Sequence, residues 1–443
     1  MPDPSASTEE MDRLFQPRSR LLAMAAFEAA LAAASADAGV MPKAAAAVIA
    51  DICASESFDA DEIFDAQRLA GNPAIPFVRQ LTERVGRRDA AAAAWVHVGA
   101  TSQDVIDSAT MLLARDALAI LQRDLQRLRD GLALLAAREA ETPMIGRTLL
   151  QQAIPISLGF KLAGWLAGLD RAANGLAELT DCALALQFGG PAGTLAAFGE
   201  DGPAVARKLA AHLGLPCPAF AWHTERSRFA EIGAWLGILT GLLGKIAGDI
   251  ILAMQTEVAE LGEPAATGKG GSSAMPHKRN PVMTLFAVAA ATRTPHLVGA
   301  LFACLAQEHE RAAGAWHAEW PLLPQLFGHA HAATLAVLDT VEGLEIDAAA
   351  MARNLEATSG LIYAERLTAA LAPHLGKGEA QRLVEVWCRE AVAGGHALAD
   401  IAESHRARHV PALSAEELRD AFDPADQIAA AARAVEAMLR QRE

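Results

Sequence analysis

Residues 108–141 read SATMLLARDALAILQRDLQRLRDGLALLAAREAE, and apolar side chains recur along this run in alternating steps of three and four. That spacing forms one continuous apolar seam on an α-helix. The seam consists of Met111, Ala114, Leu118, Leu121, Leu125, Leu128, Leu132 and Leu135. At about 1.5 Å per residue the helix is about 50 Å long. A helix of this length needs other long helices to cover it, so the segment predicts a long bundle formed between subunits.

Three further segments have the composition of long helices. They are residues 226–261, residues 282–307 with Pro295 as a kink, and residues 322–344. Alanine and leucine dominate the whole chain, with a single tyrosine and few β-branched runs, and this favours helix almost everywhere. No alternating run is long enough to require a sheet.

Shorter helices flank the long ones on both sides. Residues 20–38 predict a helix, and the prolines of segment 72–76 interrupt the pattern that follows. Beyond residue 347, glycine and proline breaks shorten the predicted helices again. We therefore predict an all-α fold of three helical domains: an N-terminal domain (1–104), a central long-helix bundle (105–346) and a C-terminal domain (347–443).

The composition excludes several classes of protein. The chain has 443 residues and a net charge of −15, so its overall field repels nucleic acid, and an anionic substrate needs a locally basic pocket. Five cysteines without a Cys-x-x-Cys motif are typical of free thiols in a reducing compartment. The N-terminus lacks the pattern of a signal peptide, and Lys245 and Asp249 interrupt the most apolar stretch. We expect a cytoplasmic protein that neither spans a membrane nor binds nucleic acid.

Residues 268–281, GKGGSSAMPHKRNP, gather glycines, hydroxyls and cations in one loop. The loop is not a Walker phosphate loop, because no strand precedes it and Lys269 is followed by glycine. Asn280 and Pro281 predict the start of a helix, with asparagine as the cap and proline in the first position. Free N–H groups there, beside Lys278 and Arg279, suit a carboxylate. The segment therefore predicts a mobile loop that closes over a small anion.

A second polar cluster, residues 97–104, directly precedes the longest predicted helix. Thr101 and Ser102 are positioned to cap that helix or to hold a substrate carboxylate at its N-terminus. His97 has the chemistry of a general acid or base, although an isolated histidine is as often structural.

Two weaker clusters complete the set of candidates. Arg147, Thr148 and Gln151 are polar groups in an apolar setting, a pattern that on its own is more typical of a salt bridge. Residues 307–320 contain histidines and carboxylates, but the two histidines lie eight residues apart, which does not match a His-Glu-x-x-His zinc motif. Arg311 and Trp316 instead suggest a cationic and aromatic wall around an anionic pocket.

These clusters together resemble the fumarase/aspartase superfamily, whose signature is the string Ser-Ser-x-Met-Pro-x-Lys-x-Asn-Pro found at 272–281. More closely, the chain resembles the bacterial 3-carboxy-cis,cis-muconate cycloisomerase family in residues 97–104, 187–190, 254–257, 268–281, 307–311 and 316–320. The similarity extends from about Phe15 to near the C-terminus. It implies an all-α subunit, a homotetramer whose core pools the long helices, and active sites that three subunits share.

One departure separates this chain from some members of the superfamily. In adenylosuccinate lyases a catalytic histidine follows the Gly-Arg-Thr motif and pairs with a glutamate four residues beyond the Asn-Pro proline. Leu149 and Leu285 occupy those positions here. Loss of one partner would strand a buried charge at a cost of about 3–5 kcal/mol, whereas loss of both fits a site with different chemistry. The cycloisomerase interpretation is therefore favoured over the lyase interpretation.

The resemblance implies a reaction of the β-ketoadipate pathway of aromatic degradation, in which a small polycarboxylate closes to a γ-lactone without cofactor or metal. It assigns catalysis to Ser272, His97 and Lys278, and leaves open which of them protonates carbon. It assigns substrate binding to Thr101, Ser102, Arg147, Gln151, Ser273, Asn280, Arg311 and Trp316. Three alternatives remain: a 4-sulfomuconate cycloisomerase, an adenylosuccinate-type lyase, and an inactive scaffold like the lens crystallins.

Overall fold

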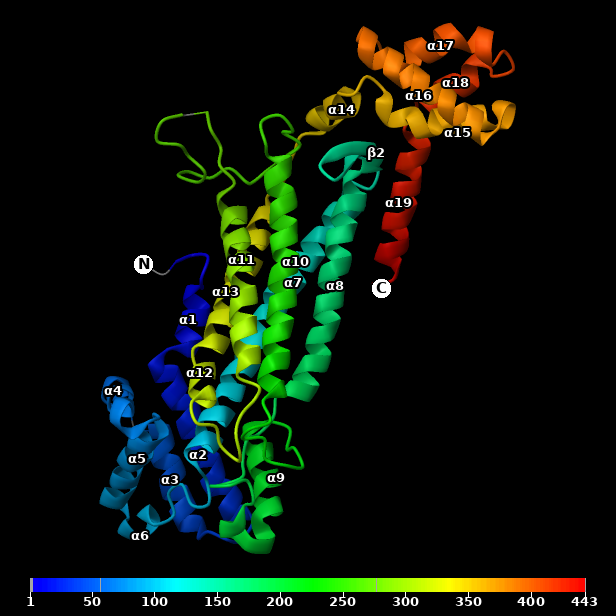
Figure 1. Ribbon diagram of the computed structural model, residues 1–443. Helices are drawn as coiled ribbons and strands as arrows, with labels where there is room; N and C mark the ends of the chain where they lie inside the picture. The colour runs from blue at the N-terminus through cyan, green and yellow to red at the C-terminus, as the bar shows by residue number, and fades with distance from the viewer. Residues whose placement is uncertain (1–2, 56, 276, 443) are drawn as a thin grey trace. The chain divides into compact units, whose positions relative to one another are not determined.

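The computed structural model describes residues 3–55, 57–275 and 277–442, and helices dominate it (Figure 1). The long helices of the central part are α7 (Ser102–Arg138), α8 (Leu158–Ala183), α10 (Ser227–Ala253), α11 (Val282–Ala303) and α13 (Leu322–Glu342). The helices that precede them are α1 (Glu9–Phe15), α2 (Pro17–Asp37), α3 (Lys43–Ser55), α4 (Ala60–Ala70), α5 (Ala74–Arg88) and α6 (Ala90–Ala93). The predicted all-α fold is confirmed.

The remaining elements are short. Between the long helices lie η1 (Ala196–Asp201), α9 (Gly202–Leu213) and α12 (Ala315–Glu319). The C-terminal elements are α14 (Ala348–Glu356), η2 (Leu361–Tyr363), α15 (Ala364–Leu375), α16 (Lys377–Gly394), α17 (Leu398–His409), α18 (Ala415–Ala421) and α19 (Ala425–Arg440). The strands are β1 (Pro143–Thr148), β2 (Gln151–Ser157), β3 (Leu261–Gly262) and β4 (Glu345–Ile346).

The seam predicted along residues 108–141 forms the buried face of α7. Its residues from Met111 to Leu132 are at most 3% exposed, and Leu135 is half-buried near the end of the helix. The helix begins earlier than the seam, at Ser102, because the Asp104 carboxylate accepts the Thr101 N–H at 3.1 Å. This bond satisfies one of the unpaired donors at the helix start.

Two other boundaries differ from the prediction. Helix α10 ends at Ala253 rather than at residue 261, because the chain turns back so that Glu260 N–H donates to the Ala253 carbonyl at 2.9 Å. Helix α11 runs through Pro295 and ends at Ala303.

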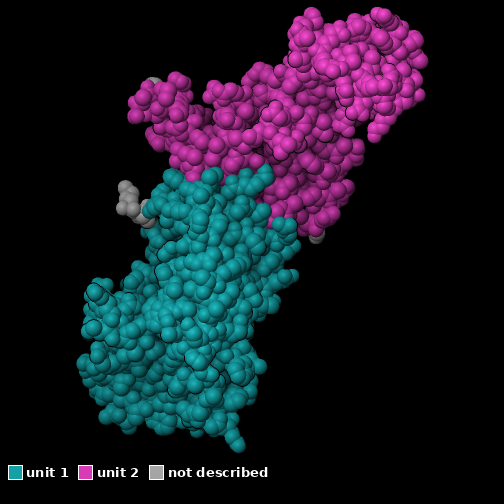
Figure 2. All heavy atoms as spheres, in the orientation of Figure 1, with its two compact units in different colours: residues 1–126, 171–245, 286–337 teal, residues 127–170, 246–285, 338–443 magenta. Residues whose placement is uncertain are grey.

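The described chain separates into two compact units (Figure 2). Unit 1 contains residues 1–126, 171–245 and 286–337, and unit 2 contains residues 127–170, 246–285 and 338–443. The boundary between the units falls within each of α7, α8, α10, α11 and α13. The predicted three-domain division at residues 104 and 346 follows a different principle, the change in helix length, and stays a prediction.

Two short antiparallel strand pairs were not predicted from the sequence. Strands β1 and β2 form a hairpin in which Thr148 pairs with Gln151, and β3 pairs with β4. The hairpin turn is Leu149-Leu150, with positive φ angles of 50° and 63°. A two-residue turn of this kind normally carries asparagine or glycine, and its leucines give the sequence no turn signal.

The apolar long helices are incompletely covered within one chain. By length and composition, α2, α10 and α11 are each apolar enough to cross a membrane among the residues described. The buried share of the apolar window falls from 67% in α2 to 44% in α10 and 22% in α11. Where α10 and α11 do meet, a Cβ at Gly244 would lie 2.4 Å from Ala291 Cβ, so glycine permits the close approach. Among the residues described, α11 therefore has the smallest buried share of these three helices.

Candidate active site

Asp104 organises the part of the candidate site that lies in unit 1. Its buried carboxylate accepts four N–H groups: Thr101 N at 3.1 Å, Gly189 N at 3.1 Å, Gly190 N at 2.9 Å and His223 Nε2 at 2.7 Å. A carboxylate saturated in this way is held rigidly, because each bond to the charged group is strong. The network fixes the start of α7 against segment 187–190, which the resemblance had also singled out.

His97 lies in the loop before α7 and contacts a residue that sequence reasoning missed. Its Nδ1 is 2.6 Å from Oε1 of Glu28 on α2, and Glu28 is 1% exposed. Burial lowers the pKa of His97, but the charge and hydrogen bond of Glu28 outweigh it, with a smaller contribution from Asp104. The pKa of His97 is therefore raised above its ordinary value. Glu28 lies 69 positions from His97 in the sequence, and no local pattern marks the pair.

The backbone around His97 is tightly constrained. His97 itself has φ of 59°, a region that side-chain-bearing residues rarely adopt, and Gly99 has φ of 74°. A Cβ at Gly99 would lie 2.1 Å from the Phe198 ring, so glycine is required there. The loop therefore presents His97 in a fixed position rather than as a flexible side chain.

Arg311 and Thr101, both predicted to bind substrate, meet in unit 1. Arg311 donates to the Thr101 hydroxyl at 2.8 Å and to the Pro191 carbonyl at 3.1 Å. Ser102 follows Thr101 as the first residue of α7. The N–H groups of Ser102 and Gln103 have no acceptor among the residues described. They leave donors at the helix start for an anion.

Trp316 is buried, at 3% exposure, and its indole N–H donates to Asp107 at 3.0 Å. Asp107 also pairs with Arg226 at 2.7 Å, and Arg226 in turn binds Glu319 at 2.6 Å. Burial raises the pKa of Glu319, and the neighbouring Arg226 partly opposes this effect. The N–H of Trp316 is thus occupied within a buried network, and the predicted aromatic and cationic wall around an anionic pocket stays a prediction.

Arg147 and Gln151 occupy the β1–β2 hairpin of unit 2. Arg147 forms a bidentate ion pair with buried Glu260, with distances of 2.8 and 2.7 Å. Gln151 is exposed, and between the two strands the tip residues Leu149 and Leu150 are 95% and 76% exposed. The hairpin therefore presents an apolar tip and a polar flank, while the Arg147 charge is already paired.

The loop 268–281, also in unit 2, is closed at its base and open beyond it. Asn280 N–H donates to the Gly270 carbonyl at 2.8 Å, and Lys269 and Arg279 form ion pairs with Asp339 and Glu345. Pro276 of the signature lies outside the described residues. The residues between the anchors are largely exposed.

Within the loop, the Ser272 oxygen accepts the backbone N–H of Met275 at 3.1 Å and that of Ala274 at 3.4 Å. Two donors aimed at this oxygen favour negative charge on it. Ser273 and Lys278 are exposed, and the Lys278 ammonium has no hydrogen-bond partner among the residues described. Both are available to a ligand.

The predicted start of the following helix is wrong in a way that matters for binding. Helix α11 begins at Val282, one residue after Pro281, so Asn280 is not its cap. Its first donors are occupied: the buried Glu263 carboxylate accepts Met283 N–H at 3.1 Å and Thr284 N–H at 2.8 Å. An internal carboxylate thus fills the anion position that we expected substrate to use.

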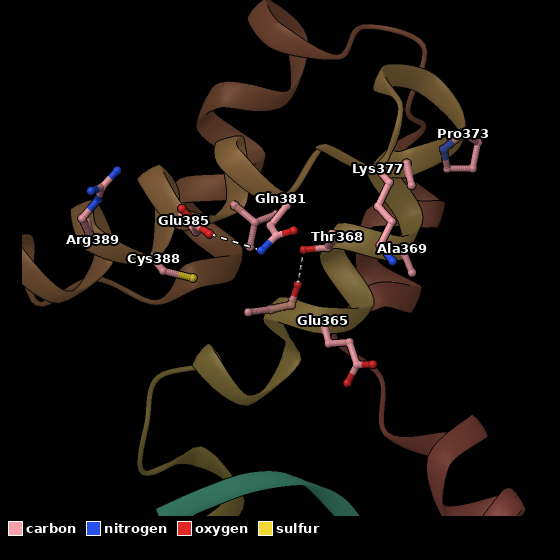
Figure 3. Close-up of a pocket in the computed structure, with 12 residues that line it drawn as sticks. Glu365, Thr368, Ala369, Pro373, Lys377, Gln381, Glu385, Cys388 and Arg389 are labelled. Atoms are coloured by element: carbon pink, nitrogen blue, oxygen red, sulfur yellow. Dashed lines mark hydrogen bonds between the residues drawn. The ribbon is translucent and has the colours of Figure 1, made fainter. Parts of the chain in front are cut away.

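Two other groupings contain none of the predicted catalytic residues. Glu10, Asp124 and His331 converge closely enough to suggest a cation site, but Arg123 donates to both carboxylates and supplies the positive charge. A cavity of about 890 Å³ lies between α15 and α16 (Figure 3). Its lining combines small apolar residues of α15, such as Ala369 and Ala372, with Lys377, Glu385 and Cys388 of α16.

Comparisons with known proteins place this geometry in a family. A family model described as lyase matches residues 6–293, and one described as adenylosuccinate lyase C-terminus matches residues 360–438. The 3-carboxy-cis,cis-muconate cycloisomerase of Bradyrhizobium diazoefficiens is 48% identical over 95% of this chain and 93% of its own length. That of Pseudomonas aeruginosa is 48% identical over 97% and 94%.

A solved structure agrees with the sequence comparisons. The crystal structure of the 3-carboxy-cis,cis-muconate lactonizing enzyme from Pseudomonas putida superposes with a TM-score of 0.92 at 42% identity, covering 99% of this chain and 98% of that one. Family model, sequence identity and fold therefore agree over nearly the whole length. The chain belongs to the lyase family of the fumarase/aspartase superfamily, in the branch that contains the 3-carboxy-cis,cis-muconate cycloisomerases.

Proposed function

We propose that this chain is a cytoplasmic cycloisomerase that converts 3-carboxy-cis,cis-muconate to 4-carboxymuconolactone in the protocatechuate branch of aromatic degradation. The observation that carries the proposal is the combination of a lyase-type Ser-Ser loop with leucine at positions 149 and 285. The loop retains the machinery for charge development next to a carboxylate. The leucines remove the histidine–glutamate pair of the adenylosuccinate lyases, so cleavage of an amine leaving group loses its acid–base pair.

Binding uses donors at the start of α7 and on the loop 268–281. Ser102 and the start of α7 receive one substrate carboxylate, with Thr101 oriented by Arg311 beside them. Lys278, Ser273 and Asn280 approach from the loop. Arg147 and Trp316 act through the residues that they hold, since their polar groups are already bonded to Glu260 and Asp107. Binding in this way folds a flexible acyclic acid into the shape from which it can close.

The bond changes balance as an addition across a conjugated double bond. One carboxylate oxygen bonds to the alkene carbon, and the π electrons move toward the carbon next to another carboxylate. That carboxylate takes up the charge as an aci-carboxylate, which His97, Lys278 and the α7 amides stabilise. A proton then moves from the Ser272 oxygen to carbon. Three carboxylates become two carboxylates and one ester, so the reaction consumes one proton, which solvent returns to Ser272.

Ser272 suits the role of proton donor because of the two amides directed at its oxygen. The alkoxide left after proton donation accepts the N–H groups of Met275 and Ala274, at 3.1 and 3.4 Å in the present structure. Fixed donors of this kind lower the free energy of the charged state without having to reorganise.

We also propose a homotetramer whose subunits share each active site. Supporting observations are the uncovered apolar surface of α11, where Leu285 and Phe302 are 48% and 45% exposed, and the apolar hairpin tip at Leu149. Covering such surfaces gains about 25 cal/mol per Å² of apolar area. A sedimentation measurement that gives a stable monomer near 46.5 kDa contradicts this assembly.

A substrate panel tests the proposed function. Purified protein is incubated separately with 3-carboxy-cis,cis-muconate, 4-sulfomuconate and adenylosuccinate, following muconate absorbance in the first two and fumarate release in the third. The proposal predicts the highest kcat/KM with the carboxy substrate and no fumarate release. Fumarate release from adenylosuccinate, with both muconates left intact, overturns it in favour of a lyase.

A further inference from the structure

We propose that Glu28 is a positioning residue that holds the His97 ring as a donor, with Nδ1–H directed to Glu28 and Nε2–H left to bind a substrate carboxylate. The inference rests on the proposed function and extends it to a residue on α2, outside every motif that marks the site. It makes His97 a cation that stabilises charge, and it excludes His97 as the base.

The geometry of the pair supports this orientation. The 2.6 Å distance between Nδ1 and Glu28 Oε1 is that of a strong, charge-assisted hydrogen bond. The other Glu28 oxygen, Oε2, is buried and has no hydrogen-bond partner among the residues described, so His97 is the group that satisfies this carboxylate. The His97 side chain is 19% exposed, and no described residue bonds its Nε2. One ring nitrogen is therefore committed to Glu28 and the other is free.

The backbone conformation and the buried Glu28 carboxylate both hold the His97 ring in one orientation. His97 stands at a positive φ of 59° in a loop that Gly99 presses against Phe198. A residue held in so rare a conformation indicates that the surrounding structure determines its placement. Rotation of the ring away from Glu28 would leave that carboxylate buried and unpaired, which is costly.

In the part of the chain that the structure describes, the charged and titratable groups around the pair come from α2, α7 and α3. Glu28 faces His97 from α2, and Asp104 adds negative charge from α7. Cys53 on α3 lies near Glu28, but burial, reinforced by the Glu28 charge, raises the pKa of this thiol to about 12 and keeps it neutral. The two carboxylates therefore oppose the effect of burial on His97, and the imidazolium persists to higher pH than that of an ordinary histidine.

The consequence for the reaction is specific. An imidazolium that donates through Nε2 binds the aci-carboxylate more tightly than the starting carboxylate, since the former carries more charge. As pH rises through the His97 pKa, the proton is lost and turnover falls. Replacing Glu28 by glutamine keeps the shape of the side chain, removes the charge and moves that loss of turnover to lower pH.

Titration of ¹⁵N-labelled histidine by NMR tests the assignment directly in the wild-type protein, E28Q, E28D and D37N. Asp37 is a matched control, because it is an exposed carboxylate on the same helix that bonds His212 at 2.9 Å. We expect the pKa of His97 to be above its ordinary value in the wild type and D37N, lowest in E28Q and intermediate in E28D. In the wild type, Nδ1 of His97 stays protonated over the whole pH range of the titration.

The pH dependence of kcat is a second measurement, and it would not change if Glu28 had a purely structural role. The high-pH limb shifts to lower pH in E28Q and not in D37N. An unchanged His97 pKa in folded E28Q, or an unprotonated Nδ1 in the wild type, overturns the proposal. If E28Q does not fold, the wild-type titration alone decides it. Failure of the wild type to lactonise the muconate overturns the proposed function instead, and the NMR result still judges Glu28.

Discussion

Segment 97–104 and the loop 268–281 both carry histidine, hydroxyl and amide side chains, but the two stretches differ in how firmly neighbouring residues hold them. In segment 97–104 three contacts fix the chain: Glu28 holds His97, Asp104 holds the start of α7, and Arg311 holds Thr101. In the loop, ion pairs hold Lys269 and Arg279 at the base while the residues between them are exposed. Segment 97–104 is thus preorganised before substrate arrives, whereas the described residues between the loop anchors are held by fewer contacts.

We infer that segment 97–104 and the loop 268–281 contribute to catalysis in different ways. A rigid anion cradle lowers the free energy of developing charge because its dipoles need not reorganise. Closure of a loop over a bound substrate excludes water, and we infer this role for the loop 268–281. We expect substitutions in the two regions to differ in kind, with the rigid segment affecting stability and activity together and the loop affecting activity alone.

The largest effect is expected for S272A. Removing the proton donor lowers kcat by about 10²–10⁴-fold, the usual range for a lost general acid, and leaves the free energy of unfolding unchanged. Steady-state kinetics and chemical denaturation measure the two quantities. S55A, which removes an exposed hydroxyl bonded to the Asp51 carbonyl, is the control and retains activity. Near-wild-type turnover in S272A transfers the donor role to His97 or Lys278.

The D104N substitution tests whether Asp104 preorganises segment 97–104. Each carboxylate oxygen accepts two of the four N–H groups, so the amide of asparagine keeps one acceptor and turns an N–H₂ group toward the other two donors. We expect a loss of about 3–5 kcal/mol in unfolding free energy together with loss of activity. D116N, an exposed aspartate on the same helix, changes stability by about 0.5 kcal/mol or less. A D104N protein of wild-type stability would show that the segment is not preorganised by this carboxylate.

A mixing experiment asks whether the two regions meet across subunits. H97N and S272A are each inactive in the proposed site, but co-expressed subunits assemble some sites with an intact copy of both residues. Random assembly restores about one site in four if the two residues come from different subunits. The activity of purified mixed tetramers measures this fraction. No recovery above the separate variants contradicts the shared site.

The smallest effect is expected at the base of the loop. E345Q removes the exposed ion pair with Arg279 and changes stability by about 0–1 kcal/mol, but it raises KM because Arg279 no longer anchors the loop. The hydrogen bond from Arg279 lowers the pKa of Glu345. Its stabilising contribution is therefore present above the ordinary glutamate pKa and is lost as pH falls through the lowered value.

E342Q is the matched control for that measurement, since Glu342 forms a similarly exposed pair with Arg127 at 2.9 Å. Both variants should lose comparable stability, and KM should rise in E345Q alone. Equal KM values in the two variants would show that the Arg279 pair does not position the loop.

The local sequence pattern predicts the helical scaffold well, but it does not predict which side chains pair with the candidate site residues. The seam from Met111 to Leu132 is a periodic signal within one helix, and it identified α7 as the central long element. Glu28 gives no comparable signal, because its partnership with His97 depends on how α2 packs in three dimensions. The same holds for Glu263, which caps α11 from a separate segment, and for the hairpin tip, whose leucines lack turn-forming character. Motifs predict which residues are candidates for the chemistry, whereas the partners of those candidates became visible only in the fold.

Lactonisation of 3-carboxy-cis,cis-muconate in D₂O, followed by ¹H NMR, tests the proposed addition and proton transfer to carbon. The account predicts 4-carboxymuconolactone carrying one deuterium on the carbon next to the carboxylate, with uptake of one proton equivalent from solvent per turnover. Formation of fumarate from a succinyl adduct, with the muconate unchanged under the same conditions, would contradict it.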